Sequence, residues 1–427
     1  MKTTILSVNS GSSSIKISVY SLKERHADPE QIAEVRVSGL TAPPMGVSYV
    51  RRGQRIHKDM EPPSTVRTPG DAFKMMVHML IDDPELSDIA RAEDIAITCH
   101  RIVHGGDFTE AQLVTRETYH TLELLSDLAP LHNGAALDNV KTCIELLPKT
   151  RNVACFDSQF HATMPPHVST YPIDQEIARK NHLRKYGFHG ISYAFIARNT
   201  ASALARDASD LNVIALHLGS GASACAIRAG KSWDTSMGLT PLAGLPGATR
   251  SGSIDPSLVF HYASDVGKLS PSSTANLHIS TAEEILNKKS GWSALAGTTD
   301  FSVIARRDTP ERRLAFDLFV GRVAGYVGSY FVALEGRVDA LVFAGGIGEK
   351  SAALREAVVH AVRCLGFAVD AKKNEDASSS SSVVEDITAA ATDTDAGSKS
   401  TPRVLVCQTD EQFEMARICS SRDDLWE

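Results

Sequence analysis

Residues 8–16 read VNSGSSSIK and join two strand-like runs, residues 4–8 and residues 17–20. The turn between them is rich in Gly and hydroxyl groups and ends in a lysine. This pattern predicts a β-hairpin that presents backbone N–H groups, hydroxyls and one cation to a phosphate. Its spacing differs from that of the helix-opening Walker loop. An ordinary Ser/Gly turn has the same appearance, so this stretch alone does not establish a phosphate site.

The same pattern returns in the second half of the chain. An apolar run, residues 213–216, leads into HLGSGAS (217–223) and then into a second apolar run. Asn9 lines up with His217, and Gly11 lines up with Gly219. Two such hairpins at equivalent places predict a duplicated α/β domain that binds a nucleotide between the two copies.

The bulk composition is that of an ordinary water-soluble protein. With 427 residues the chain exceeds what one core usually spans, so two domains are expected. A net charge of −7 gives no basic excess for nucleic acid or an anionic membrane. The N-terminus lacks the features of a secretory signal. Seven cysteines without a CxxC pair fit reduced thiols, which predicts a cytoplasmic protein.

Strand-like runs repeatedly end at polar or Gly-rich clusters, which is how α/β folds place their sites. In chain order these clusters are HRIVHGG (100–106), Asp157, AGGIGE (344–349) and TDE (409–411). Residues 374–401 consist mainly of Ser, Thr, Ala and Asp with few large apolar side chains. Such a composition predicts a flexible low-complexity insertion.

The chain resembles the acetate kinase (acetokinase) family of the acetate and sugar kinase/heat-shock protein 70/actin superfamily. The resemblance runs nearly end to end, interrupted by residues 374–401. It rests on VNSGSSSIK, HRIVHGG, PLHNGAALD (130–138), FDSQFHATMP (156–165), YGFHGISY (186–193), ALHLGSGASACAIRAG (215–230), DTSMGLTPLAGLPGATRSGSIDP (234–256), FAGGIGEK (343–350) and TDEQ (409–412), in the order found in the family.

This resemblance implies an α/β fold of two ribonuclease-H-like (actin-like ATPase) domains with an inter-domain active-site cleft. We expect one domain at residues 1–157 with 412–427 and a nucleotide-binding domain at 158–411. The implied reaction is reversible transfer of the γ-phosphoryl group of ATP to acetate, giving acetyl phosphate and ADP. The implied cofactor is Mg²⁺, with Mn²⁺ as an alternative, and the implied assembly is a homodimer.

Phosphoryl transfer requires positive charge around three equatorial oxygens and alignment of the attacking and leaving groups. Arg101 and Arg250 are candidates, because a planar guanidinium binds carboxylate and phosphate bidentately. His189 would hydrogen-bond the transferring group, and His132 is a further candidate. Asp157 would align the acetate or orient an arginine. Each has a structural alternative: a buried satisfied histidine, an ion pair for an arginine, and a helix cap for Asp157.

The resemblance assigns three further sets of residues. The metal ligands would be Asn9 and Glu411, directly or through water. Acetate would bind Arg101 and a small apolar pocket of Val103, Leu131, Phe188 and Pro241, although these four could equally be core residues. The nucleotide would contact Ser12, Ser14, Lys16, His217, Gly219, Ser220, Gly221, Asp300, Phe301, Gly346, Ile347 and Gly348.

Four positions depart from the family pattern. Ser220 stands where Asn is usual, Ser253 replaces an acidic residue, Ser302 replaces an arginine and Lys350 replaces Asn. All four lie on or near the nucleotide side, which leaves ATP or pyrophosphate open as the donor. Propionate or another short-chain acid is an open alternative to acetate, and so is a catalytically silent nucleotide-binding relative. The intact set Arg101, Asp157, His189, Arg250 and Glu411 argues against silence.

Overall fold

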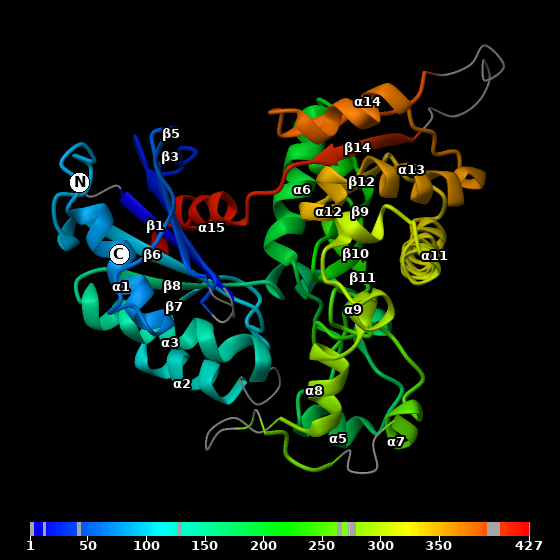
Figure 1. The fold of residues 1–427 in the computed structure, drawn as a ribbon, viewed down its shortest axis with the longest axis horizontal. Helices are drawn as coiled ribbons and strands as arrows, with labels where there is room; N and C mark the ends of the chain where they lie inside the picture. Colours follow the sequence, from blue (N-terminus) through cyan, green and yellow to red (C-terminus); the bar gives the residue numbers. More distant parts are fainter. Residues whose placement is uncertain are drawn as a thin grey trace. The chain divides into compact units, whose positions relative to one another are not determined.

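The computed structural model describes residues 4–11, 14–40, 44–125, 130–262, 267–271, 273, 279–390 and 402–426, with the backbone alone at 130–132, 135 and 262. The chain forms two compact units, residues 1–159 with 410–427 and residues 160–409. The first unit runs from blue to cyan and ends in red in Figure 1, and the second runs from green to orange-red. The domain bounds expected from the sequence, 157/158 and 411/412, stay a prediction.

The first unit contains an eight-stranded mixed sheet in the order β5-β4-β3-β2-β1-β6-β8-β7. Strands β1, β6 and β8 are parallel, and the remaining pairs are antiparallel. The strands are β1 Thr4–Ser10, β2 Ser14–Ser21, β3 Glu30–Ser38, β4 Gly46–Arg51, β5 Gln54–Met60, β6 Ile95–Ile102, β7 Gln112–Leu113 and β8 Arg151–Phe156.

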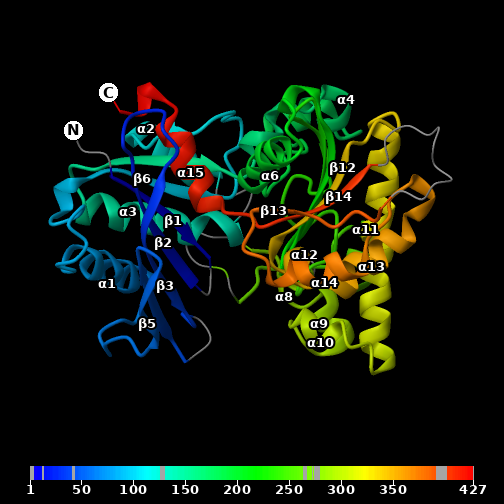
Figure 2. The ribbon, with the colours of Figure 1, turned by 90° about the horizontal axis from the view of Figure 1, so that it is seen from above.

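Helices cover both faces of this sheet. The helices are α1 Pro69–Ile81, α2 Arg116–Leu125, α3 Pro130–Leu146 and α15 Glu411–Ser420, with 3₁₀ turns at Ala92–Asp94 and Asp423–Leu425. A further 3₁₀ turn, Gln159–Thr163, begins at the last residue before the unit boundary and lies mostly in the second unit. Figures 1 and 2 show α15 on the opposite side of the sheet from α1 and α3. Alternate residues of β2, such as Ile17 and Val19, are buried with Phe73 and Met76 of α1. The period-2 strand therefore packs its apolar face on the helix.

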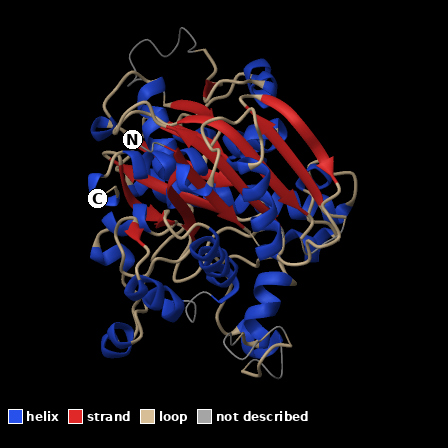
Figure 3. Ribbon diagram, turned by 90° about the vertical axis from the view of Figure 1, so that its left-hand side faces the viewer, coloured by secondary structure: helices blue, strands red, loops and turns tan. Residues whose placement is uncertain are grey.

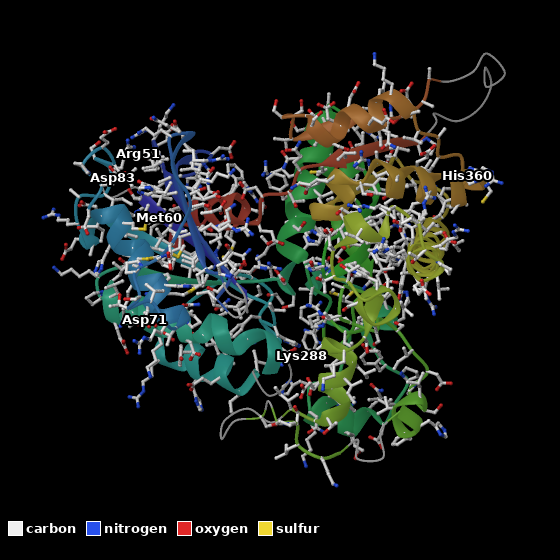
Figure 4. All side chains as sticks on the ribbon, viewed as in Figure 1. Arg51, Met60, Asp71, Asp83, Lys288 and His360 are labelled. Atoms are coloured by element: carbon white, nitrogen blue, oxygen red, sulfur yellow. The ribbon has the colours of Figure 1, made fainter. Side chains whose placement is uncertain are left out.

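The start of α1 and its connection to the sheet are fixed by polar contacts (Figure 4). Thr68 and Asp71 form a capping box at the N-terminus of α1. Asp83, after the helix, accepts from Arg51 of β4 at 2.6 and 2.8 Å. Tyr49 donates to the same carboxylate at 2.5 Å. Burial disfavours the charged carboxylate, but these donors outweigh it and lower the pKa of Asp83.

The second unit contains a six-stranded sheet in the order β11-β10-β9-β12-β14-β13. Its strands are β9 Asn212–Leu218, β10 Ala222–Arg228, β11 Lys231–Thr235, β12 Ala340–Ala344, β13 Val384–Asp386 and β14 Arg403–Cys407, drawn in red in Figure 3. Strands β9, β10 and β11 are antiparallel to their neighbours among the three, and β12 and β14 run parallel to β9. The first unit repeats this arrangement in β3-β2-β1-β6-β8. The predicted duplicated α/β fold is therefore confirmed. In each unit the phosphate-type hairpin joins the first two strands of the sheet in chain order.

The helices of the second unit also lie on two faces. They are α4 Pro166–Ser169, α5 Gln175–Lys180, α6 Gly190–Ala203, α7 Leu258–Tyr262, α8 Thr281–Lys288, α9 Gly291–Ala296, α10 Phe301–Ile304, α11 Pro310–Ala333, α12 Gly345–Lys350, α13 Ala352–Ala361 and α14 Ala371–Asp376, with 3₁₀ turns at Ala208–Asp210, Arg363–Leu365 and Ala377–Ser379. Helix α6 covers one face, and α11 and α13 cover the other (Figures 1 and 2). Within the described residues, no helix combines the length and hydrophobicity needed to cross a membrane.

The predicted flexible insertion at 374–401 is wrong for residues 374–390. Residues 371–376 form α14, and residues 384–386 form β13, which pairs with β14 at the edge of the sheet. Asn374 and Ala377 are buried. Short side chains can enter a core that is supplied by other elements, so low local hydrophobicity does not exclude ordered packing. Residues 391–401 lie outside the described residues.

Candidate functional site

The first unit brings four predicted residues together. Arg101, at the end of β6, donates from Nε and Nη2 to the two oxygens of Asp157 at 3.0 and 2.7 Å. Its Nη1 lies 2.8 Å from Glu411 Oε2 and 3.5 Å from Asn9 Oδ1. Asn9 Nδ2 also donates to Glu411 Oε2 at 3.1 Å. The predicted acetate-binding arginine and both predicted metal ligands therefore form one hydrogen-bonded cluster, which we call the Arg101 cluster.

The sheet explains why this cluster forms. Strands β1, β6 and β8 run parallel, and Arg101 is in register with Cys155, two residues before Asp157. The carboxyl ends of parallel strands share one edge of a sheet. Asp157 also donates its backbone N–H to Ile102 O at 3.0 Å. The residues after β6 and β8 are therefore held side by side.

The electrostatics of the cluster favour a permanent cation. The side chain of Asp157 is 1% exposed and that of Arg101 is 18% exposed. Burial disfavours the charged guanidinium, but the charges of Asp157 and Glu411 outweigh this effect and raise the pKa of Arg101 above its ordinary value. Since Nε and Nη2 are bound by a buried carboxylate, the Nη1 edge is the one that can exchange partners.

Helix α15 places Glu411 in the cluster. Asp410 caps the helix by accepting from Phe413 N–H at 2.9 Å. Gln412 donates from Nε2 to the carbonyls of Ser7 and Lys16 at 3.1 and 3.2 Å. Ser7 Oγ donates in return to the Gln412 carbonyl at 3.0 Å. These contacts attach the first turn of α15 to the β1–β2 hairpin that carries Asn9.

The donor set fits a hard divalent cation. The amide oxygen of Asn9 and the carboxylate of Glu411 are oxygen ligands of the type that Mg²⁺ prefers, and Mg²⁺ usually keeps several waters as its remaining ligands. Within the described residues, no group of three or more His, Cys, Asp or Glu side chains could hold a metal ion. Two protein ligands match a metal that is completed by water and phosphate rather than by a protein cage.

The other predicted residues of the first unit have contacts that do not point to a particular ligand. Lys16 pairs its ammonium with Glu34 at 2.9 Å. The backbone carbonyl of Ser14 accepts the Gly11 N–H at 2.8 Å and closes the hairpin turn. Ser12 lies outside the described residues. Val103 is half-buried beside Arg101. Their roles toward nucleotide and acetate stay predictions.

Helix α3 is docked on the HRIVHGG segment by an amide. Asn133 accepts the His104 N–H at 3.0 Å and donates to the His104 carbonyl at 3.0 Å. His104 Nδ1 accepts the Gly106 N–H at 3.1 Å. The two residues before Asn133, Leu131 and His132, lie in α3, but their side chains are outside the described part of the structure.

In the second unit, His189 lies at the N-terminus of α6 with φ of 59°, in the left-handed region. The preceding Gly187 has φ of 78°, and a Cβ there would lie 2.3 Å from Thr235 Cγ2. Glycine is therefore required at this turn. The ring of His189 lies 4.3 Å from the ring of His217, centroid to centroid. His217 Nδ1 is 2.7 Å from Ser192 Oγ.

The turn before His189 is supported by a residue that the sequence did not identify. His161, within FDSQFHATMP, is buried and donates from Nε2 to the Phe188 carbonyl at 3.0 Å. Its Nδ1 lies 2.7 Å from Ser232 Oγ. Burial lowers the pKa of His161 to about 4, so the ring is neutral. Phe188 is buried, and its predicted contact with acetate stays a prediction.

Arg250 lies directly beside the second phosphate-type hairpin. A Cβ built on Gly221 would lie 3.1 Å from Arg250 Nη1, so a side chain there would press on the guanidinium. Arg250 also donates to the Pro241 carbonyl at 3.5 Å. The Ser220 carbonyl accepts the Ala248 N–H at 2.8 Å, which joins the hairpin to the loop of Arg250. Gly219 closes the turn by donating to the Gly221 carbonyl at 3.1 Å.

Helix α12 meets the same hairpin. Gly345 has φ of 74°, and a Cβ there would lie 2.8 Å from the Leu218 carbonyl, so the end of β9 and the start of α12 are in close contact. Gly346 is exposed, with nothing within 4 Å of a built Cβ. Ile347 is half-buried and Gly348 is buried. The exposed backbone at Gly346 is the part of α12 that a nucleotide could approach closely.

A buried arginine holds the far end of α12. Arg355, which is 0% exposed, donates from Nη1 to the Gly348 and Glu349 carbonyls at 2.8 and 2.7 Å. It also binds the Asn374 side chain and carbonyl at 2.7 and 2.5 Å and Ser378 Oγ at 3.0 Å. Burial lowers the pKa of Arg355 to about 10. Among the ion pairs of the described residues, none includes Arg355. Its five hydrogen bonds all go to neutral oxygens.

Two predicted nucleotide residues have clear structural roles. Asp300 caps α10 by accepting the Ser302 N–H at 2.8 Å. The ring of Phe301 is 5% exposed and packs against Trp292 and Phe319 at centroid distances of 5.4 Å each. A nucleotide contact would use the surface of α10 rather than this ring, and it stays a prediction.

The departures from the family pattern are accommodated locally. Ser253 Oγ accepts the Gly244 N–H at 2.9 Å. Lys350 is exposed at the end of α12. Ser302 donates its N–H to the cap of α10. These contacts show how the substituted residues fit the fold, and they do not identify the phosphoryl donor.

Sequence reasoning also missed Ser223, Tyr193 and Arg355. Ser223 Oγ lies 2.8 Å from His189 Nδ1 and 2.5 Å from Tyr193 Oη. The first two lie inside quoted motifs, so the motifs are a signal that could have found them. Arg355 lies five residues after FAGGIGEK on an amphipathic helix, where an arginine normally reads as a surface residue.

Comparison with known proteins places this geometry in a family. The acetokinase family matches residues 4–417. A protein of Chaetomium globosum named probable acetate kinase is 59% identical over 457 aligned positions, covering 100% of this chain and 99% of that protein. A solved propionate kinase of Francisella tularensis has a TM-score of 0.80 at 32% identity, covering 97% of this chain and 98% of that one. Porphyromonas gingivalis acetate kinase has a TM-score of 0.77 at 30% identity, with the same coverage. Because the family match spans nearly the whole chain, this chain belongs to the acetokinase family.

Proposed function

We propose that this enzyme is an acetate kinase that transfers the γ-phosphoryl group of ATP reversibly to acetate, giving acetyl phosphate and ADP. The observation that carries the proposal is the Arg101 cluster. Arg101 has two donors fixed by buried Asp157 and a third, Nη1, directed at groups that can exchange. A small carboxylate would replace a carboxylate that this edge already contacts.

The proposed chemistry is positioning and charge stabilisation. Acetate is ionised at neutral pH, so its oxygen can attack the γ-phosphorus without a general base. A new O–P bond forms while the bond to the ADP oxygen breaks. Arg101 would hold the carboxylate, and Arg250 and His189 would stabilise charge on the equatorial oxygens. His132 is proposed to assist on the same oxygens.

A divalent metal ion is a general requirement of kinases of this family. We propose Mg²⁺, with Mn²⁺ as an alternative, held by Asn9 and Glu411 with water. The metal would neutralise phosphate charge when bound. Glu411 contacts Arg101 at 2.8 Å, so the ion and the arginine draw on the same carboxylate.

We propose ATP as the donor. Gly219, Ser220 and Gly221 form a tight turn beside Arg250, and the exposed backbone of Gly346 leaves room for close approach. The proposed contacts of the nucleotide are otherwise those expected from the sequence: Ser12, Ser14, Lys16, His217, Asp300, Phe301, Ile347 and Gly348. Pyrophosphate remains the rival donor because of Ser220, Ser253, Ser302 and Lys350.

A second candidate substrate is propionate, because one matching solved structure is a propionate kinase. We propose Val103, Leu131, Phe188 and Pro241 as the pocket for the acyl chain. A single methylene changes discrimination by about 1–3 kcal/mol. We therefore expect propionate to react, but with a lower kcat/KM than acetate.

The proposal is tested by hydroxamate detection of acyl phosphate, with Mg-ATP or pyrophosphate as donor and acetate or propionate as acceptor. We expect acetyl phosphate from Mg-ATP, and less propionyl phosphate. Product from pyrophosphate but not from Mg-ATP would overturn the donor assignment. If the folded protein binds nucleotide and forms no acyl phosphate with either donor, it is a silent relative.

We further propose a homodimer in the cytoplasm. All seven cysteines are free thiols, six of them buried, which suits a reducing compartment. Leu314, Leu318 and Val332 on α11 are 56%, 36% and 75% exposed, which is apolar area that a second copy could cover. Light scattering of the purified protein should give twice the mass of one chain, and a single-chain mass would refute the dimer.

A further inference from the structure

Two buried hydroxyls form a chain behind His189. Ser223 Oγ lies 2.8 Å from His189 Nδ1, and Tyr193 Oη lies 2.5 Å from Ser223 Oγ. Both Ser223 and Tyr193 are 0% exposed. Tyr193 stands one helical turn after His189 on α6, and its N–H donates to the His189 carbonyl at 2.9 Å. Ser223 faces His217 across the β9–β10 ladder.

The hydrogens that Tyr193, Ser223 and His189 carry decide which group donates to which along this row of hydrogen bonds. Burial raises the pKa of Tyr193 well above its ordinary value. The phenol therefore keeps its hydrogen, which can be donated to Ser223 Oγ. Ser223 can then donate its own hydrogen only onward, to His189 Nδ1.

The opposite direction is less favourable. If His189 Nδ1 carried the hydrogen, Ser223 would accept it and donate to Tyr193. The buried O–H of Tyr193 would then have no acceptor among its described contacts. A buried donor left unpaired is destabilising, so the first direction is favoured.

We propose that Ser223 and Tyr193 are positioning residues that hold His189 in the tautomer protonated at Nε2. Nδ1 is then an acceptor fixed by the hydroxyl chain, and the hydrogen of the neutral ring lies on Nε2. This inference rests on the proposed function: the hydrogen on Nε2 is the one that His189 would donate to the transferring phosphoryl group.

The tautomer is measured directly on the enzyme without substrates, by ¹⁵N NMR of ¹⁵N-histidine-labelled protein. The signal is assigned by its loss in His189→Gln. We expect a protonated Nε2 and an unprotonated Nδ1 in the wild type. In Ser223→Ala and in Tyr193→Phe the two tautomers should mix. Since this readout needs no turnover, it decides the proposal even if the protein forms no acetyl phosphate.

Kinetics supply a second readout. Ser223→Ala should lower kcat about 10- to 100-fold, the scale of a misaligned catalytic group, while the ATP KM changes less than about threefold. Ser223→Thr, which keeps the hydroxyl, should restore most of kcat. The matched control is Tyr330→Phe, because Tyr330 is buried in the same unit and its hydroxyl has no hydrogen-bond partner among the described residues. This control should change neither the tautomer nor kcat.

Two results would overturn the proposal: a wild-type His189 protonated at Nδ1, or a tautomer that is unchanged in both hydroxyl variants. If Ser223→Ala does not fold, Tyr193→Phe alone decides, since it removes the first donor of the chain and keeps the ring.

Discussion

Replacing Asp157 by asparagine tests whether this carboxylate is the residue that orients Arg101. In the wild type, Arg101 donates to both oxygens of Asp157, at 3.0 and 2.7 Å. In the Asp157→Asn variant the side chain would keep one acceptor and turn an NH₂ group toward a guanidinium N–H. One charge-assisted bond is lost and a donor–donor contact replaces it.

The expected magnitude follows from these two contacts. A hydrogen bond to a charged group contributes about 1.5–3 kcal/mol, and the lost bond together with the repulsive contact amounts to about 2–4 kcal/mol. At about 1.4 kcal/mol per factor of ten, kcat/KM for acetate should fall about 30- to 1000-fold. The KM for ATP should change much less, since Arg101 is proposed to bind the carboxylate.

The assay is acetyl phosphate formation at varied acetate, with thermal unfolding measured in parallel. The matched control is Asp83→Asn, which alters a second Arg–Asp pair of the same unit, part-buried and formed by Arg51 Nη1 with both oxygens of Asp83. That variant should lose stability and keep its acetate kinetics. A folded Asp157→Asn enzyme with kcat/KM for acetate within about threefold of wild type would refute the orienting role.

Val103→Ala should raise the propionate/acetate ratio of kcat/KM by a factor within the ~1–3 kcal/mol of one methylene; an unchanged ratio would remove Val103 from the pocket. Arg355→Met should lower the free energy of unfolding by at least about 3 kcal/mol, because several buried oxygens lose a charged donor. It should also raise the ATP KM more than the acetate KM; equal changes in both would exclude a specific effect on α12. Burial lowers the pKa of His100 from 6.5 to about 4, so the unfolded chain binds more protons between these pH values and stability falls as pH falls through them. From about pH 7 to about pH 4, the free energy of unfolding measured in urea should fall by about 3 kcal/mol less in His100→Leu than in the wild type. The same pH dependence of this free energy in both proteins would contradict the assignment.

The repeated hairpins, the α/β class and the strand ends that carry Arg101, Asp157 and Glu411 could be predicted from the sequence. These features depend on interactions close in sequence: the alternation of apolar residues in a strand, the Gly and hydroxyl content of a turn, and a polar cluster directly after a strand. The family motifs then supplied the chemistry of the individual residues. Duplication was readable because both copies keep the same local pattern.

Only the tertiary structure decided how those residues are paired. Arg101 and Asp157 are 56 residues apart, and the parallel register of β6 and β8 joins them. Glu411 reaches the same guanidinium because Gln412 docks α15 on a hairpin about 400 positions earlier in the chain. Composition misjudged residues 374–390, since Asn374 is ordered by Arg355 and β13 by its pairing with β14. The physical reason is common to all three cases: a polar group becomes ordered or charged according to the partners that distant segments bring to it, and local sequence does not contain those partners.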